Sequence, residues 1–101
     1  MTAEAVSERR VKEIIAEVYM RSPRDRSLTW QEIGSQMPLY SLTEEEESLG
    51  LDSLDAVEIA IELEEAFDVV LPPEIDPLEV HTVDQITELL KRLRQKQGGR
   101  A

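Results

Sequence analysis

The stretch that decides the fold is GLDSLDAVEIAIELEEAFD, residues 50–68, which predicts a helix from Ser53 or Leu54 to about Asp68. On a helical wheel one face is wholly apolar and consists of Ala56, Ile59, Ala60, Leu63, Ala66 and Phe67. The opposite face mixes acidic and aliphatic side chains and consists of Leu54, Asp55, Val57, Glu58, Ile61, Glu62 and Glu65. Aspartate and serine both cap helices well, so the simplest interpretation of GLDSLD is a helix N-terminus.

Two more helices follow from the spacing of apolar residues. In the first, Val11, Ile14, Ile15 and Val18 recur at helical spacing, and Ser22-Pro23 ends the pattern. The last opens with the capping box Thr82-Val83-Asp84-Gln85 and continues with an apolar stripe of Val83, Ile86, Leu89, Leu90 and Leu93. Between the second and last helices, residues 71–80 hold three prolines, which leave room for a turn or two of helix. We expect Ile75, Leu78 and Val80 to fill the core there.

The connection between the first and second helices, residues 21–52, is long and should have structure of its own. Capping-box patterns begin at Thr29 and at Thr43, so a short helix is expected after each. Trp30, Ile33 and Leu39 are expected to cover one edge of the bundle. The predicted fold class is all-α, a small bundle of three main helices plus one short helix, with an extended loop between the first two.

Length and composition limit the chain to one small domain. Its 101 residues fit a single domain over 1–101, with disordered ends at about 1–6 and 97–101. The chain has no cysteine, which excludes a disulfide framework, a thiolate metal site and a cysteine nucleophile, and which fits a reducing cytoplasm. The N-terminal MTAEAVSERR lacks the apolar run of a signal peptide, and no stretch is long enough to cross a bilayer.

The charge of the chain is strongly acidic and unevenly distributed. The formal net charge is −11, and none of the 11 Lys and Arg falls in residues 27–90, which hold 17 of the 22 Asp and Glu. Such a field repels nucleic acid and anionic membranes and speeds encounter with basic protein surfaces. The alternative is that the acidic residues only keep the protein in solution.

Most enzymatic interpretations fail because the required groups are missing. A serine nucleophile needs a base, and the single histidine, His81, is expected to be a solvated residue just before a helix cap. The run of residues 44–47 lacks the alternating ligands of a calcium loop. No metal-ligand spacing, Gly-rich phosphate loop or basic patch with aromatic residues is present.

Ser53 remains the residue with available chemistry. A serine at a helix N-terminus lies beside free backbone donors and the positive end of the helix dipole, which stabilise an attached phosphate by about 0.3 to 1 kcal/mol. Gly50 permits a tight turn and leaves room for a modifying enzyme. The position suits a phosphorylated group.

Residues 50–54, followed by DAVEIAIELEEAFDVVLPPE, resemble the attachment site and second helix of acyl carrier proteins. This resemblance implies that Ser53, flanked by Asp52 and Leu54, bears 4′-phosphopantetheine transferred from coenzyme A. The thiol of that arm would hold acyl groups as thioesters for fatty-acid, polyketide or related lipid biosynthesis. The protein itself would be a carrier and no enzyme, and a monomer.

The resemblance also implies which surface meets partner enzymes. Basic patches of a phosphopantetheinyl transferase (holo-acyl-carrier synthase), acyl or malonyl transferases and ketosynthases would contact the acidic and aliphatic face. That face comprises Asp52, Leu54, Asp55, Val57, Glu58, Ile61, Glu62 and Glu65. Neither nucleic acid nor a membrane span is expected.

The resemblance does not extend over residues 21–47, and it leaves other functions open. The segment around Trp30 is expected to pack near the arm and to help choose partners. An aminoacyl, peptidyl or D-alanyl carrier is the nearest alternative, followed by an unmodified helical interaction module and a hydrolase. The small residues Ala56, Ala60 and Ala66 favour close helix packing, with space for an acyl chain as the second interpretation.

Overall fold

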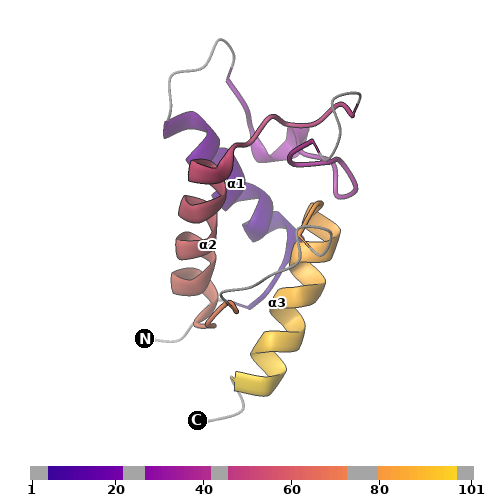
Figure 1. Ribbon diagram of the computed structural model, residues 1–101. Coiled ribbons are helices and arrows are strands. Elements are labelled where there is room, and N and C mark those ends of the chain that lie inside the picture. The colour runs from indigo at the N-terminus through magenta and orange to yellow at the C-terminus, as the bar shows by residue number, and fades with distance from the viewer. Residues whose placement is uncertain (1–4, 22–26, 42–45, 73–79, 98–101) are drawn as a thin grey trace.

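The computed structural model describes residues 5–21, 27–41, 46–72 and 80–97. Within these ranges lie three α-helices, α1 (Glu8–Arg21), α2 (Ser53–Phe67) and α3 (Val83–Gln97), and one 3₁₀ turn, η1 (Trp30–Glu32) (Figure 1). No strand occurs in these ranges, so the prediction of an all-α fold is confirmed. The short helix expected among residues 71–80 and the capping pattern at Thr43 fall largely outside the described residues.

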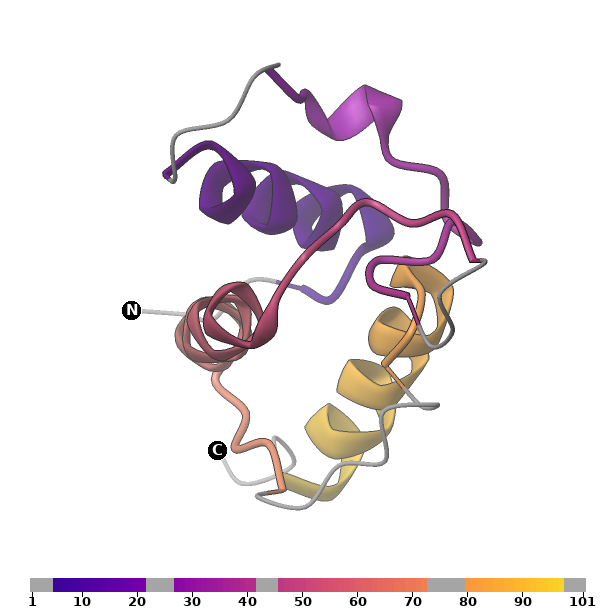
Figure 2. The same ribbon diagram turned by 45° about the horizontal axis from the view of Figure 1, so that its top comes forward.

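Helix α1 forms the centre of the described core. Its predicted apolar stripe, Val11, Ile14, Ile15 and Val18, is almost completely buried. α1 packs against α2, α3 and η1, and Figure 2 shows it lying across one side of the pair formed by α2 and α3. The main contribution to the core from α2 comes from Phe67 at its end, which is fully buried. Burial of the three amphipathic faces against one another therefore holds the helices together.

The connection between α1 and α2 is packed onto this core. Ile33 and Leu39 are buried, as predicted, whereas Trp30 is half-buried and stacks under the Arg9 guanidinium, 4.7 Å from the ring centre. The capping pattern at Thr29 forms the turn η1, in which the Thr29 backbone N–H donates to a carboxylate oxygen of Glu32 (2.9 Å).

The C-terminal ends of α2 and α3 are tied to each other. Asp68 ends α2 in the left-handed conformation (φ 53°), and Arg94 of α3 donates to the Phe67 carbonyl oxygen (2.7 Å). The Gln97 amide accepts from the Val70 N–H (2.8 Å) and donates to the Val70 carbonyl oxygen (3.0 Å). Gln97 was expected at the edge of a disordered end, and these two hydrogen bonds explain its place in α3.

The predicted capping box at the start of α3 is present. The Gln85 backbone N–H donates to Thr82 Oγ1 (3.3 Å), and the Thr82 N–H donates to Gln85 Oε1 (3.2 Å). Thr87, one turn into the helix, is 3% exposed, and its hydroxyl has no hydrogen-bond partner among the described residues. The hydroxyl of Thr82, just before α3, thus accepts a hydrogen bond, whereas that of Thr87 within α3 is buried with no partner among the described residues.

We predict that Thr87→Val raises the free energy of unfolding by about 1 kcal/mol, because it removes an unpaired buried hydroxyl without changing the shape of the side chain. The same substitution at Thr82 should lower it by about 1 kcal/mol, because the cap is lost. Urea denaturation followed by circular dichroism measures both. Equal effects of the two substitutions would contradict this account.

Candidate functional site

Ser53 is the first residue of α2, and its side chain is exposed. The residue that caps the helix is Asp52, which has extended backbone geometry (φ −106°, ψ −175°). GLDSLD therefore does form a helix N-terminus, but aspartate and not serine supplies the cap. The Ser53 hydroxyl makes no hydrogen bond with any residue that the structure describes. It is available for chemistry.

Asp55 completes the cap and is buried. Its backbone N–H donates to Asp52 Oδ1 (2.9 Å), while the Asp52 N–H donates to Asp55 Oδ2 (3.1 Å). The helical wheel predicted Asp55 on the exposed face, yet it is only 4% exposed. The difference arises because the Asp55 carboxylate turns back toward the N-cap, so the side chain does not point in the direction that the helical wheel predicts.

Gly50 lies three residues before Ser53 and has a left-handed backbone conformation. Its φ of +86° lies in the left-handed region that residues with a Cβ atom rarely adopt. No heavy atom lies within 4 Å of where a Cβ would be, so the backbone conformation and not a lack of space requires glycine. The open space expected around Gly50 is present, whereas the expected tight turn is not, because residues 46–52 form neither a turn nor a bend.

A groove opens beside Ser53, here called the Ser53 groove. It is lined by Tyr40, Ser41, Ser48, Gly50, Leu51, Asp52, Ser53, Ala56 and Val80. Trp30, whose segment was expected to pack near the arm, lines a different groove beside α1. Part of the lining of the Ser53 groove does come from the connection between α1 and α2. Two backbone hydrogen bonds fix it there, from Leu49 N–H to the Pro38 oxygen (2.9 Å) and from Leu51 N–H to the Leu39 oxygen (3.1 Å).

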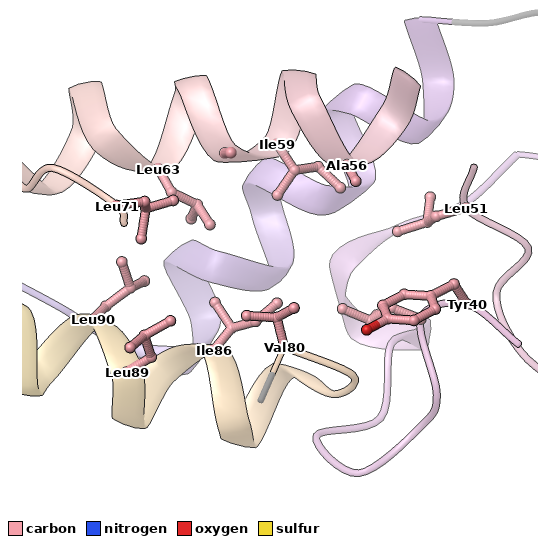
Figure 3. Close-up of a pocket in the computed structure, with 12 residues that line it drawn as sticks. Tyr40, Leu51, Ala56, Ile59, Leu63, Leu71, Val80, Ile86, Leu89 and Leu90 are labelled. Atoms are coloured by element: carbon pink, nitrogen blue, oxygen red, sulfur yellow. The ribbon is translucent and has the colours of Figure 1, made fainter. Parts of the chain in front are cut away.

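An apolar cavity of about 180 Å³ lies between α2 and α3 (Figure 3). Its described lining residues are Leu39, Tyr40, Leu51, Ala56, Ile59, Ala60, Leu63, Leu71, Val80, Ile86, Leu89 and Leu90. The sequence favoured close helix packing as the reason for the alanines of α2. In the structure Ala56 and Ala60 line the cavity, so their small size leaves space between the two helices.

The aliphatic residues on the opposite side of α2 are exposed, as the wheel predicted. Leu54, Val57 and Ile61 are 73%, 57% and 48% exposed. Together with Asp52, Glu58, Glu62 and Glu65 they form what is called here the outer face of α2. Exposed aliphatic side chains grouped on one helix face are typical of a binding surface.

The sequence analysis did not foresee that a basic residue reaches this face. Arg21, at the end of α1, lies 3.6 Å from a carboxylate oxygen of Glu58 and 3.3 Å from one of Glu62. All three side chains are partly exposed, so each pair stabilises the fold only weakly. Their main effect is to reduce the negative charge of the outer face.

His81 is also placed differently from the prediction. Its side chain is 14% exposed, and Nε2 lies 3.0 Å from the Tyr40 carbonyl oxygen and 2.9 Å from Glu46 Oε1. Both neighbours are acceptors, so Nε2 carries a proton and donates. The expectation of a solvated histidine is therefore wrong. Among the described residues, no group of three or more acidic or histidine side chains could hold a metal ion.

Comparison with known proteins identifies the family. The family model for the phosphopantetheine attachment site (PP-binding) matches residues 38–95, more than half of the chain. The chain belongs to this family. The expectation that phosphopantetheine is its cofactor is thereby confirmed, and Ser53, Gly50 and all the described residues that line the groove and the cavity lie within the matched residues.

The chain is also similar to an acyl carrier protein from Syntrophobacter fumaroxidans (strain DSM 10017 / MPOB). The two are 48% identical over 46 residues, which are 46% of this chain and 56% of the relative. The chain thus spans little more than half the length of that relative. No solved structure matches this chain. None of the helices in the described part of the chain is long and apolar enough to cross a membrane.

We predict that Asp55→Ala lowers the free energy of unfolding by about 1 to 2 kcal/mol, because it removes the acceptor for the Asp52 N–H at the start of α2. Glu65→Ala removes an exposed carboxylate of the same helix and should change it by less than about 0.5 kcal/mol. Urea denaturation of the two variants provides the comparison. Similar values would mean that the carboxylate of Asp55 does not stabilise α2.

Proposed function

We propose that the protein is an acyl carrier whose Ser53 hydroxyl is joined to 4′-phosphopantetheine by a phosphodiester. The single observation on which this rests is the exposed Ser53 side chain at the start of α2, left free because Asp52 supplies the cap. Membership of the phosphopantetheine-attachment family and the similarity to an acyl carrier protein support it. The positive end of the α2 dipole also favours a phosphate at this position.

The carrier role needs no catalytic group in the chain. The arm supplies the thiol that this cysteine-free sequence lacks, and acyl groups travel on it as thioesters. His81, the sole histidine, has its Nε2 directed at Tyr40 and Glu46. Partner enzymes would perform the chemistry, and tethering raises the local concentration of cargo at whichever enzyme is docked.

The apolar cavity favours acyl over aminoacyl cargo. The described side chains that line it are aliphatic apart from Tyr40. An aminoacyl group carries an ammonium, and burying an unpaired charge among aliphatic side chains is costly. An alkyl chain gains roughly 0.8 kcal/mol for each CH₂ that it buries. The second interpretation of the alanines, space for an acyl chain, thus gains support over an aminoacyl or D-alanyl carrier.

The outer face of α2 is the proposed docking surface for partner enzymes. Its exposed Leu54, Val57 and Ile61 offer apolar contact, and the carboxylates around them attract basic patches. A transferase that attaches the arm, acyl or malonyl transferases and ketosynthases are the partners in this proposal. A single helix face makes a small interface, so docking is weak and release fast, as a carrier that serves several enzymes requires.

The attachment site is tested by incubating the protein with coenzyme A and a broad-range phosphopantetheinyl transferase. We predict that intact mass rises by one phosphopantetheinyl group and that Ser53→Ala abolishes the increase. Ser48→Ala is the matched control, because Ser48 lines the same groove, and it should be labelled like the wild type. Labelling that persists in Ser53→Ala would refute the site, and an unlabelled but folded wild type would refute the carrier function.

The docking surface is tested through Arg21. We predict that Arg21→Ala speeds association with the transferase about two- to threefold at low salt, because Glu58 and Glu62 lose their basic neighbour. The gain should vanish near about 1 M salt, where charges are screened beyond about 3 Å.

Arg92→Ala is the control for net charge, since it removes an exposed arginine of α3. An equal acceleration by Arg92→Ala would show that total charge and not the outer face matters. Stopped-flow association rates measure both variants.

A further inference from the structure

Tyr40 lines both the Ser53 groove and the apolar cavity. We propose that Tyr40 determines which cargo enters the cavity: it admits a narrow, unbranched alkyl chain and excludes cargo that carries a ring. This inference rests on the carrier function proposed above. It assigns a role to the connection between α1 and α2, for which the sequence predicted only packing near the arm and a part in choosing partners.

The groove and the cavity meet where four of the described residues line both: Tyr40, Leu51, Ala56 and Val80. An arm attached to Ser53 starts in the groove, so cargo that enters the cavity from the groove passes these four. Figure 3 shows Tyr40 at the end of the cavity beside Leu51 and Val80. Tyr40 is the largest of the four, and Ala56 is small, so the tyrosine ring sets the width of the passage.

The position of Tyr40 is held from His81, two residues before α3. Its ring meets the His81 ring edge-on, with centres 5.2 Å apart, and its carbonyl oxygen accepts from His81 Nε2 (3.0 Å). The neighbouring Leu39 N–H donates to the His81 carbonyl oxygen (2.9 Å). Glu46 Oε1 lies 2.9 Å from the same Nε2 and orients the histidine ring. The tyrosine is therefore placed by several directed contacts and not by general packing.

The cavity itself is large enough for a ring, so the passage and not the cavity must make the selection. At about 180 Å³ it exceeds the roughly 150 Å³ of an engineered apolar cavity that binds benzene. A linear chain of about six carbons has about as many carbon atoms as benzene, so it also fits this volume. At the passage, however, it presents only the width of one CH₂. Replacing Tyr40 with a small residue should therefore extend the accepted cargo to phenyl groups.

The test loads wild type, Tyr40→Ala, Tyr40→Phe and Trp30→Ala with acetyl, hexanoyl or 3-phenylpropanoyl arms, using the transferase and the corresponding acyl-coenzyme A. Hydroxylamine then cleaves each thioester, which forms a hydroxamate and frees the thiol of the arm. The rate is expressed relative to the same acyl-coenzyme A in solution. Trp30→Ala is the matched control, because Trp30 is an aromatic residue of the same connection that lines a different groove.

In the wild type the hexanoyl thioester should be cleaved at least about tenfold more slowly than the acetyl thioester, since each buried CH₂ is worth about fourfold. The phenylpropanoyl thioester should react like the acetyl one. In Tyr40→Ala the phenylpropanoyl thioester should also be slowed about tenfold. Tyr40→Phe and Trp30→Ala should behave as the wild type, because the passage keeps its ring in both.

The outcomes separate the two proposals. If intact mass shows no loading of Ser53, the carrier function fails and this inference fails with it. If loading occurs and Tyr40→Ala keeps the wild-type ratio between hexanoyl and phenylpropanoyl rates, the carrier function stands and the role of Tyr40 is refuted. Should Tyr40→Ala lose its helical circular dichroism, Tyr40→Leu serves for the same comparison, with the same result expected.

Discussion

The exchange of hydrogen bonds between Asp52 and Asp55 determines where α2 begins and what Ser53 is free to do. If Ser53 were the N-cap, its hydroxyl would be turned toward the backbone N–H groups of the first turn. Because Asp52 accepts the Asp55 N–H, the serine moves one position into the helix and its side chain remains exposed. The left-handed Gly50 lies in the irregular stretch that leads to this point.

Leu39 connects this N-terminus to α3. Its N–H donates to the His81 oxygen just before α3, and its carbonyl oxygen accepts the Leu51 N–H two residues before Ser53. The distance between the serine and α3 is therefore fixed by backbone hydrogen bonds through the connection between α1 and α2. Direct packing of α2 on α3 is not needed, and an apolar cavity can remain between the two helices without loosening the attachment site.

Apolar periodicity predicted the three α-helices, the buried stripe of α1 and the exposure of Leu54 on α2, because these depend on local spacing. It failed at Asp55, because a wheel gives a direction from the helix axis and not the path of a side chain that turns back to cap. It could not find the partners of His81, which lie 41 and 35 residues away along the sequence. Apolar periodicity also could not predict the cavity, because it does not give the distance between helices.

The two sides of α2 differ in burial: one packs in the core, and the other keeps aliphatic side chains exposed. Leu54 is 73% exposed, so folding gains little from it, although complete burial of such a side chain is worth about 1.5 to 3 kcal/mol. That free energy remains available for binding a partner. Arg21 would act against it, because the basic partner proposed above would compete for Glu58 and Glu62 with an arginine already beside them. Because residues 27–90 contain no Lys or Arg, this competition comes from α1 and weakens binding without altering α2 itself.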